Sequence, residues 1–61
     1  MTKFECILEG LEIFKRYNYL EIAVEHDEIW AGGKVYEQDE ERLKELGWSW
    51  QSLYDSWMIT V

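Results

Sequence analysis

The sequence predicts an α+β fold in the order α-β-β-α-β-β, with a small antiparallel sheet and both helices packed on one face of it. Three observations support this fold class. Apolar residues recur at helical spacing over residues 3–17, alternate with polar residues over residues 20–25, and alternate again over residues 57–61. A chain of 61 residues makes a single domain, residues 1–61, which is too small for a nucleotide-binding α/β fold or for a barrel around a deep pocket.

The first helix is expected from Lys3 to Tyr17. Its apolar stripe consists of Phe4, Ile7, Leu8, Leu11 and Phe14. Thr2 and Glu5 have the spacing of a capping box, in which each side chain satisfies a backbone N–H of the first turn. Asn18 is a residue type that adopts the left-handed conformation at the end of a helix. Gly10 weakens a helix by about 1 kcal/mol relative to Ala, so it indicates close packing at this position.

A strand with one buried face is expected where Leu20, Ile22 and Val24 alternate with residues of the opposite face. The polar residues 26–28 interrupt this strand, and residues 29–31 form a second one, which two glycines end. A hairpin is the favoured interpretation, and a single bent strand is the alternative. Residues 34–38 are expected to form a connection, in which residues 35 and 36 could extend the sheet.

A short second helix is expected from Asp39 to Leu46. Acidic residues fill its first turn, where they interact favourably with the helix dipole, and Gly47 stands where a left-handed cap belongs. A helix of this length is not stable alone, so it needs the sheet beneath it. Residues 48–50 are expected to resume the sheet, residues 51–55 to form a turn, and residues 57–61 to form the last strand.

Three short stretches stand out in the part of the chain from residue 20 to residue 61. They are E-H-D-E-I-W at residues 25–30, the ending L-K-E-L-G-W of the acidic helix at residues 43–48, and S-W at residues 56–57. Together they resemble a group of short acidic proteins encoded by bacteriophages and prophages. The resemblance implies a phage or prophage origin and a compact α+β fold. The resemblance itself supplies no activity. Because small acidic phage proteins include inhibitors of host defence, inhibition of a host factor is expected by analogy with the class.

Candidate catalytic and metal-binding groups are few. His26 stands among Glu25, Asp27 and Glu28, but consecutive residues at a hairpin point apart, whereas metal ligands converge from separate positions. We interpret this group as a structural turn, with a metal-binding or proton-transfer role and a contact with a partner as the minor alternatives. Cys6 has no neighbouring base and is expected to pack as a small apolar residue. The sequence therefore predicts a protein that is not an enzyme and that has no metal and no cofactor.

The cysteine content and the charge indicate where the protein works and what it binds. A single Cys cannot form an internal disulfide, which is typical of a cytoplasmic protein, and no apolar run approaches the roughly 20 residues of a membrane span. Residues 1–16 carry no net charge, so residues 17–61 hold the whole formal charge of −7. This negative charge disfavours direct DNA or RNA binding and suits a basic protein surface. Solubility alone is the alternative explanation.

The aromatic residues give the second indication of function. Phe4, Phe14 and either Trp48 or Trp57 are expected to fill the inner face of the sheet. Four others are expected on its open face or in its turns, where they could bind a partner: Trp30, Tyr36, Trp50 and Tyr54. The alternative is that a small fold needs large aromatics simply to bury enough area.

The predicted function is therefore non-enzymatic binding of a protein with a basic surface. Trp30 and Tyr54 are expected to be the anchors of this interaction. The expected steering charges are Glu37, Asp39, Glu40 and Glu41. The specific form is inhibition of a host factor that acts in defence or handles nucleic acid. The alternative is a structural or regulatory homo-oligomer, in which a homodimer covers the sheet or joins its edge strands.

Overall fold

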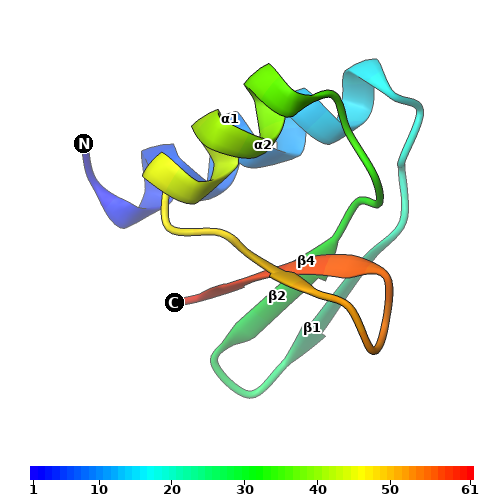
Figure 1. The fold of residues 1–61 in the computed structure, drawn as a ribbon. Helices are drawn as coiled ribbons and strands as arrows, with labels where there is room; N and C mark the ends of the chain where they lie inside the picture. The colour runs from blue at the N-terminus through cyan, green and yellow to red at the C-terminus, as the bar shows by residue number, and fades with distance from the viewer.

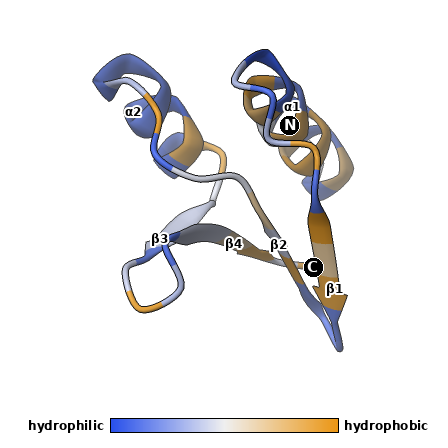
Figure 2. Ribbon diagram, turned by 90° about the vertical axis from the view of Figure 1, so that its right-hand side faces the viewer, coloured by the Kyte–Doolittle hydropathy of each residue, from blue (hydrophilic) through white to orange (hydrophobic).

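The computed structural model describes all residues from Met1 to Val61 and contains two helices and a four-stranded antiparallel sheet (Figure 1). The elements are α1 (Lys3–Arg16), β1 (Ile22–Glu25), β2 (Glu28–Ala31), α2 (Glu37–Glu45), β3 (Ser49–Gln51) and β4 (Ser56–Thr60). The strand order is β1-β2-β4-β3, so two hairpins meet where β2 pairs with β4. Both helices lie on one face of the sheet, with α2 on the side of β3 and α1 on the side of β1 (Figure 2). The predicted fold class and element order are confirmed.

The ends of α1 follow from its sequence. The Thr2 hydroxyl accepts a hydrogen bond from the Glu5 N–H at 3.1 Å, and the Thr2 N–H donates to the Glu5 carboxylate at 2.8 Å. Beyond the last turn, Asn18 adopts a φ of 66°, and the Tyr19 N–H donates to the Phe14 carbonyl at 3.0 Å. The predicted capping box and the predicted left-handed end are both confirmed. Neither helix is long and apolar enough to cross a membrane.

The core fills the space between the helices and the sheet. Its buried apolar residues are Ile13, Phe14, Ala31, Leu43, Leu46, Trp48, Trp57 and Ile59. The Phe14 ring meets the Trp48 ring edge-on, with 5.2 Å between the centroids. The Trp48 indole N–H donates to the Cys6 carbonyl at 3.1 Å, and the Trp57 indole N–H donates to the Gly33 carbonyl at 2.9 Å. Both buried indoles are therefore satisfied.

The expectation that β1 has a buried face is wrong. Leu20, Ile22 and Val24 are 68%, 52% and 66% exposed. Ile22 is paired with the buried Ala31, so it points to the helix side of the sheet, but β1 is the edge strand and α1 leaves this face open. Phe4 and Leu8, which belong to the expected apolar stripe of α1, are exposed as well.

The second half of the chain differs from the sequence prediction mainly in element boundaries. α2 begins at Glu37 instead of Asp39, residues 35 and 36 do not join the sheet, and Trp48 lies buried in the connection before β3. Gly47 follows α2 with a φ of 100°, which confirms its predicted capping role.

Candidate functional site

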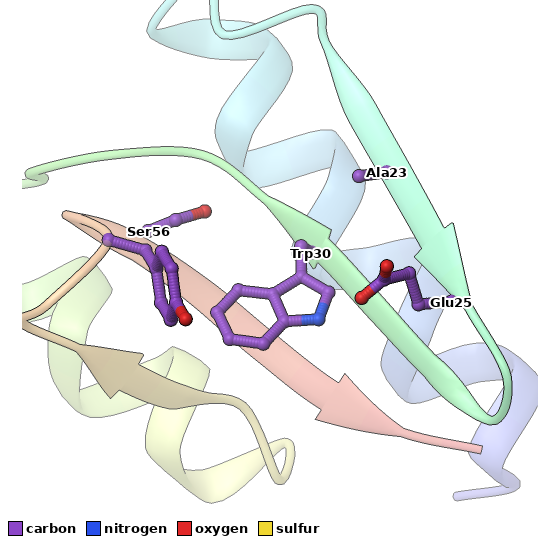
Figure 3. Close-up of a pocket in the computed structure, with 5 residues that line it drawn as sticks. Ala23, Glu25, Trp30 and Ser56 are labelled. Carbon is purple, nitrogen blue, oxygen red and sulfur yellow. The ribbon is translucent and has the colours of Figure 1, made fainter.

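The open face of the sheet, on the side away from the helices, carries a hollow of about 390 Å³. The residues that line it are Ala23, Glu25, Trp30, Tyr54 and Ser56. Figure 3 shows the Trp30 indole between the Glu25 carboxylate and Ser56. Trp30 and Tyr54, the two residues predicted as anchors, are the large side chains of this hollow. We call this pair the Trp30–Tyr54 corner.

The register of the sheet places Trp30 on the open face. Trp30 is paired with Ala23 on β1 and with Met58 on β4, while the next residue, Ala31, is buried in the core. Because successive side chains of a strand point to opposite faces, Trp30 points away from the helices. The small side chain of Ala23 covers little of the indole, which is only half-buried.

The β3–β4 turn brings Tyr54 to the same face. Within this four-residue turn (residues 52–55), the Tyr54 N–H donates to the Gln51 carbonyl at 3.0 Å. Asp55 adopts a φ of 49°, a conformation that Asp tolerates better than most residues. The Tyr54 ring stands at 82° to the Trp30 ring, with 5.2 Å between the centroids. The two rings thus meet at nearly a right angle, with Tyr54 largely exposed.

Two acidic side chains lie next to the Trp30–Tyr54 corner, where β1 and β2 meet at their turn. Glu25 and Glu28 stand directly opposite each other in the register, and the Trp30 indole N–H donates to the Glu28 carboxylate at 3.4 Å. Like charges directly opposite each other are unfavourable, and none of the three ion pairs of the structure involves either carboxylate. Negative charge without a cationic partner therefore lies beside an accessible aromatic ring.

This combination of groups suits a cation. An ammonium or guanidinium group over the face of a Trp ring is attracted by the negative potential of that face. In the Trp30–Tyr54 corner such a group would have a ring beneath it, a second ring at its side, and the Glu25 carboxylate within the same hollow. A guanidinium group can also donate two parallel hydrogen bonds to a carboxylate. The arrangement of the site is thus suited to a positively charged side chain.

Two of the other predicted site residues lie at the joint between the helices. Asp39 accepts hydrogen bonds from the Tyr17 hydroxyl and from Arg16 Nη2, the latter at 3.4 Å. The Tyr17 hydroxyl in turn accepts from the Tyr36 N–H at 2.9 Å. Partial burial, followed by the hydrogen bond to Asp39, raises the pKa of Tyr17. Asp39 and the backbone of Tyr36 therefore join the end of α1 to the start of α2.

The remaining predicted residues also lie in or under the helix layer. Glu37, Glu40 and Glu41 are exposed acids of α2, as is Glu45. Trp50 is paired with Trp57, their ring centroids are 5.5 Å apart, and Trp50 packs against the core instead of facing the open side. A small hollow of about 140 Å³ brings Glu40 next to Trp50. The structure therefore unites the two predicted anchors but places the predicted steering charges on the other side of the sheet.

Glu25 and Glu28 are site residues that the sequence interpretation assigned to a structural turn. The sequence does contain the signal that reveals them. If the hairpin turns at residues 26 and 27, Glu25 must face Glu28, and the period of two then places both on the face that carries Trp30.

The other candidate groups of the sequence are placed as follows. His26 is exposed in the hairpin turn with a φ of 50°. Cys6 is a free, half-buried thiol that packs against the core. No three His, Cys, Asp or Glu side chains lie close enough together to hold a metal ion.

Comparison of the chain with family models, with curated proteins and with solved structures gives no match. The functional proposal therefore rests on the chemistry of the Trp30–Tyr54 corner.

Proposed function

We propose that this protein is a non-enzymatic binding protein that takes an arginine side chain of a partner protein into the Trp30–Tyr54 corner. The observation that carries this proposal is the meeting of two accessible rings with a carboxylate that has no cationic partner, in one hollow of about 390 Å³. Arginine fits better than lysine, because its planar guanidinium group stacks on an aromatic face and binds a carboxylate through two donors.

One arginine side chain does not supply the whole affinity of a protein complex. A cation over an exposed ring contributes about 0.5–1 kcal/mol, and about 2 kcal/mol when it is desolvated, whereas a micromolar complex requires about 8 kcal/mol. The corner therefore acts as an anchor within a larger contact. The net charge of −7 draws a basic surface towards the protein before that contact forms.

The partner that fits these features is a protein with a basic surface, including one that normally holds nucleic acid. The resemblance of the sequence to short phage and prophage proteins favours a host factor in the cytoplasm as the target, and inhibition as the result. In this proposal the acidic chain occupies the surface that phosphates would otherwise occupy.

The binding chemistry is testable with a small probe. We expect acetyl-Gly-Arg-Gly-amide to shift the NMR signal of the Trp30 indole N–H, the lysine analogue to shift it less, and the uncharged citrulline analogue to leave it in place. Tyr54→Ala and Glu25→Gln should each weaken the shift. The matched controls Tyr36→Ala and Glu41→Gln change an exposed tyrosine and an exposed acid outside the hollow, so they should leave it intact. Equal shifts with the arginine and citrulline peptides would refute the proposal.

The α2 acids have a separate role in the proposal. Because Glu37, Glu40 and Glu41 lie away from the corner, they act on the encounter instead of the bound state. For a partner isolated from bacterial lysate, replacing all three with Gln should mainly slow association, whereas Trp30→Ala should mainly speed dissociation. Stopped-flow measurement of both rate constants checks this division, and equal effects of both variants on both rates contradict it.

A further inference from the structure

A second surface of the molecule has no explanation in the proposed function. It combines the exposed apolar residues Phe4 and Leu8 of α1 with Leu20, Ile22 and Val24 at and before β1. We call this set the α1–β1 surface. Figure 2 shows α1 above β1 on the side of the molecule away from α2, with hydrophobic colour on both elements. Large exposed apolar side chains on both a helix and the strand beside it are typical of an interface.

The backbone of β1 is also free on this side. β1 is the end strand of the sheet, and its pairing with β2 begins at Glu25 and Glu28, on either side of a two-residue turn. In such a hairpin the residue pair next to the turn is hydrogen-bonded. Along the strands, hydrogen-bonded and non-hydrogen-bonded pairs then alternate. The N–H and C=O groups of Ile22 and Val24 therefore point outward, ready to pair with another strand.

We propose that a second copy of this chain pairs with β1, antiparallel and about a two-fold axis between the two Ile22 residues, so that the two sheets join into one of eight strands. In this register Ile22 faces Ile22 of the other copy, and Leu20 faces Val24. These are the positions whose backbone groups point outward, so each such pair can exchange two hydrogen bonds. On the helix side of the joined sheet the pairing places apolar side chains opposite apolar side chains.

The charges on β1 agree with this register. On the open face it puts Glu21 opposite Ala23 of the other copy, and Glu25 opposite Tyr19, so no carboxylate directly faces another. Moving the two-fold axis by one residue, to Ala23, would put Glu21 directly opposite Glu25 twice. Like charges in directly opposite positions are destabilising, and the backbone groups of Ala23 point towards β2, so both charge and hydrogen bonding disfavour the shifted register.

Charge also explains why a second copy fits this side in particular. Two copies of a chain with a net charge of −7 repel each other, but residues 1–16, which include all of α1, carry no net charge. The acidic α2 lies on the opposite side of the helix layer (Figure 2). Pairing through β1 brings the neutral helices together and keeps the acidic ones apart. The other edge strand, β3, has only three residues, two of them polar, and is a poor edge for pairing.

One side of the molecule has room for an interface of standard size. A standard interface takes roughly 800 Å² from each partner, close to a fifth of the 4436 Å² accessible surface of this chain. In a molecule that measures 27 × 26 × 18 Å, such an interface occupies one whole side. The α1–β1 surface includes exposed apolar residues of both the helix layer and the sheet edge.

The first test is the oligomeric state. Sedimentation equilibrium or light scattering of the full chain should give a dimer, twice the 7.4 kDa of one chain. Ile22→Lys places two ammonium groups at the two-fold axis and should give a monomer that remains folded, because Ile22 is exposed in the single chain. Ser49→Lys makes a similar charge change at an exposed position of the other edge strand and should leave the dimer intact. A wild-type monomer at millimolar concentration, or a dimer that survives Ile22→Lys, would overturn the proposal.

The second test is the register, in a Cys6→Ala background. Hydrogen-bonded antiparallel pairs have Cα atoms about 5.5 Å apart, within the range of a disulfide. Ile22→Cys should therefore give a disulfide-linked dimer on mild oxidation, and Ala23→Cys should not, since it faces Glu21 of the other copy. The opposite result would overturn the register. Ala23 lines the arginine-binding hollow, but Ile22 does not and points to the other face of the sheet. The Ile22 variants therefore leave the hollow intact, and a failure of this proposal leaves the arginine-binding proposal standing.

Discussion

Gly10 and Trp48 show how one residue fixes the distance between α1 and the core. A Cβ added at Gly10 would lie 2.2 Å from Trp48 Nε1. The indole cannot simply retreat, because its N–H donates to the carbonyl of Cys6, one turn earlier on α1. The cost of a glycine within a helix is therefore offset by a close approach that no other residue permits.

We expect Gly10→Ala to destabilise the protein. Overpacking costs about 1–3 kcal/mol, which exceeds the gain of up to about 1 kcal/mol from helix propensity. Urea denaturation should thus show a lower free energy of unfolding, while Lys15→Ala, at an exposed position of the same helix, should change it by less than about 0.5 kcal/mol. A more stable Gly10→Ala variant would show that the ring does not pack against α1 as described.

Glu9 and Arg42 form the second residue-scale contact between distant elements. Arg42 donates to Glu9 through two nitrogens, one of them Nη2 at 2.9 Å from Oε1. This hydrogen bonding lowers the pKa of Glu9 below its usual 4.5 and raises the pKa of Arg42. Because the folded state holds the Glu9 proton less tightly than the unfolded chain does, this stabilising contribution is complete above about pH 4.5 and is lost as the pH falls through the lower folded value.

The lowered pKa of Glu9 sets the direction in which stability should depend on pH. Between pH 7 and pH 3 the wild-type protein should lose more of its free energy of unfolding than Glu9→Gln, because the variant has no such contribution to lose. Glu12→Gln removes the same charge from α1 at a residue that forms none of the three ion pairs, so it should follow the wild-type slope. Chemical denaturation at a series of pH values gives the free energy of unfolding as a function of pH for all three proteins. Parallel curves for the wild type and Glu9→Gln would contradict the assigned contact.

At the scale of elements, the β1–β2 hairpin depends on His26. Its φ of 50° lies in a region that costs most residues about 1–2 kcal/mol, glycine excepted. We expect His26→Gly to be tolerated and His26→Val, with its branched Cβ, to lower the melting temperature by about 5–10 °C. Thr60→Val introduces the same side chain at an exposed strand position and should melt close to the wild type. Equal melting of both His26 variants would show that the turn does not need this conformation.

The elements themselves were largely predictable, because their signals are local. Thr2 with Glu5, Asn18 and Gly47 each act within one turn of a helix end, so sequence spacing alone reveals them. The exposure of Ile22 was not predictable in the same way. An edge strand and a central strand with one covered face have the same period of two, and only the strand order, which depends on contacts between distant hairpins, distinguishes them.

At the scale of the molecule, the same limit applies to the candidate site. Trp30 and Tyr54 were expected on the open face or in the turns, and they do lie together there. Their acidic neighbour is Glu25, however, and not the acids of α2, because the sheet separates the α2 acids from the corner. Net charge can be summed from the sequence alone. Which charged side chain lies beside which aromatic ring depends on the strand register and on the face of the sheet to which each side chain points.

The two proposed surfaces are geometrically linked. A two-fold axis through an antiparallel strand pair is perpendicular to the sheet, so both copies show their open faces on the same side. The two Trp30 residues would then be separated by three strand spacings, which with the two-residue offset along the strands gives about 16 Å. A dimer therefore presents two arginine-binding corners to one partner. A partner that fills both binds more tightly than one that fills a single corner, because its second contact is intramolecular.

This linkage predicts a difference between two peptide probes. A peptide with two arginines about 16 Å apart should bind the wild-type dimer more tightly than a single-arginine peptide, by a factor on the order of ten. Ile22→Lys should abolish this difference. Ser49→Lys carries the same added charge and should preserve the difference, which separates loss of the dimer from simple charge repulsion. Isothermal titration calorimetry of both peptides against the three proteins measures the ratio. A ratio near one for the wild type would mean that the two corners do not face the same side, even if each binds its arginine.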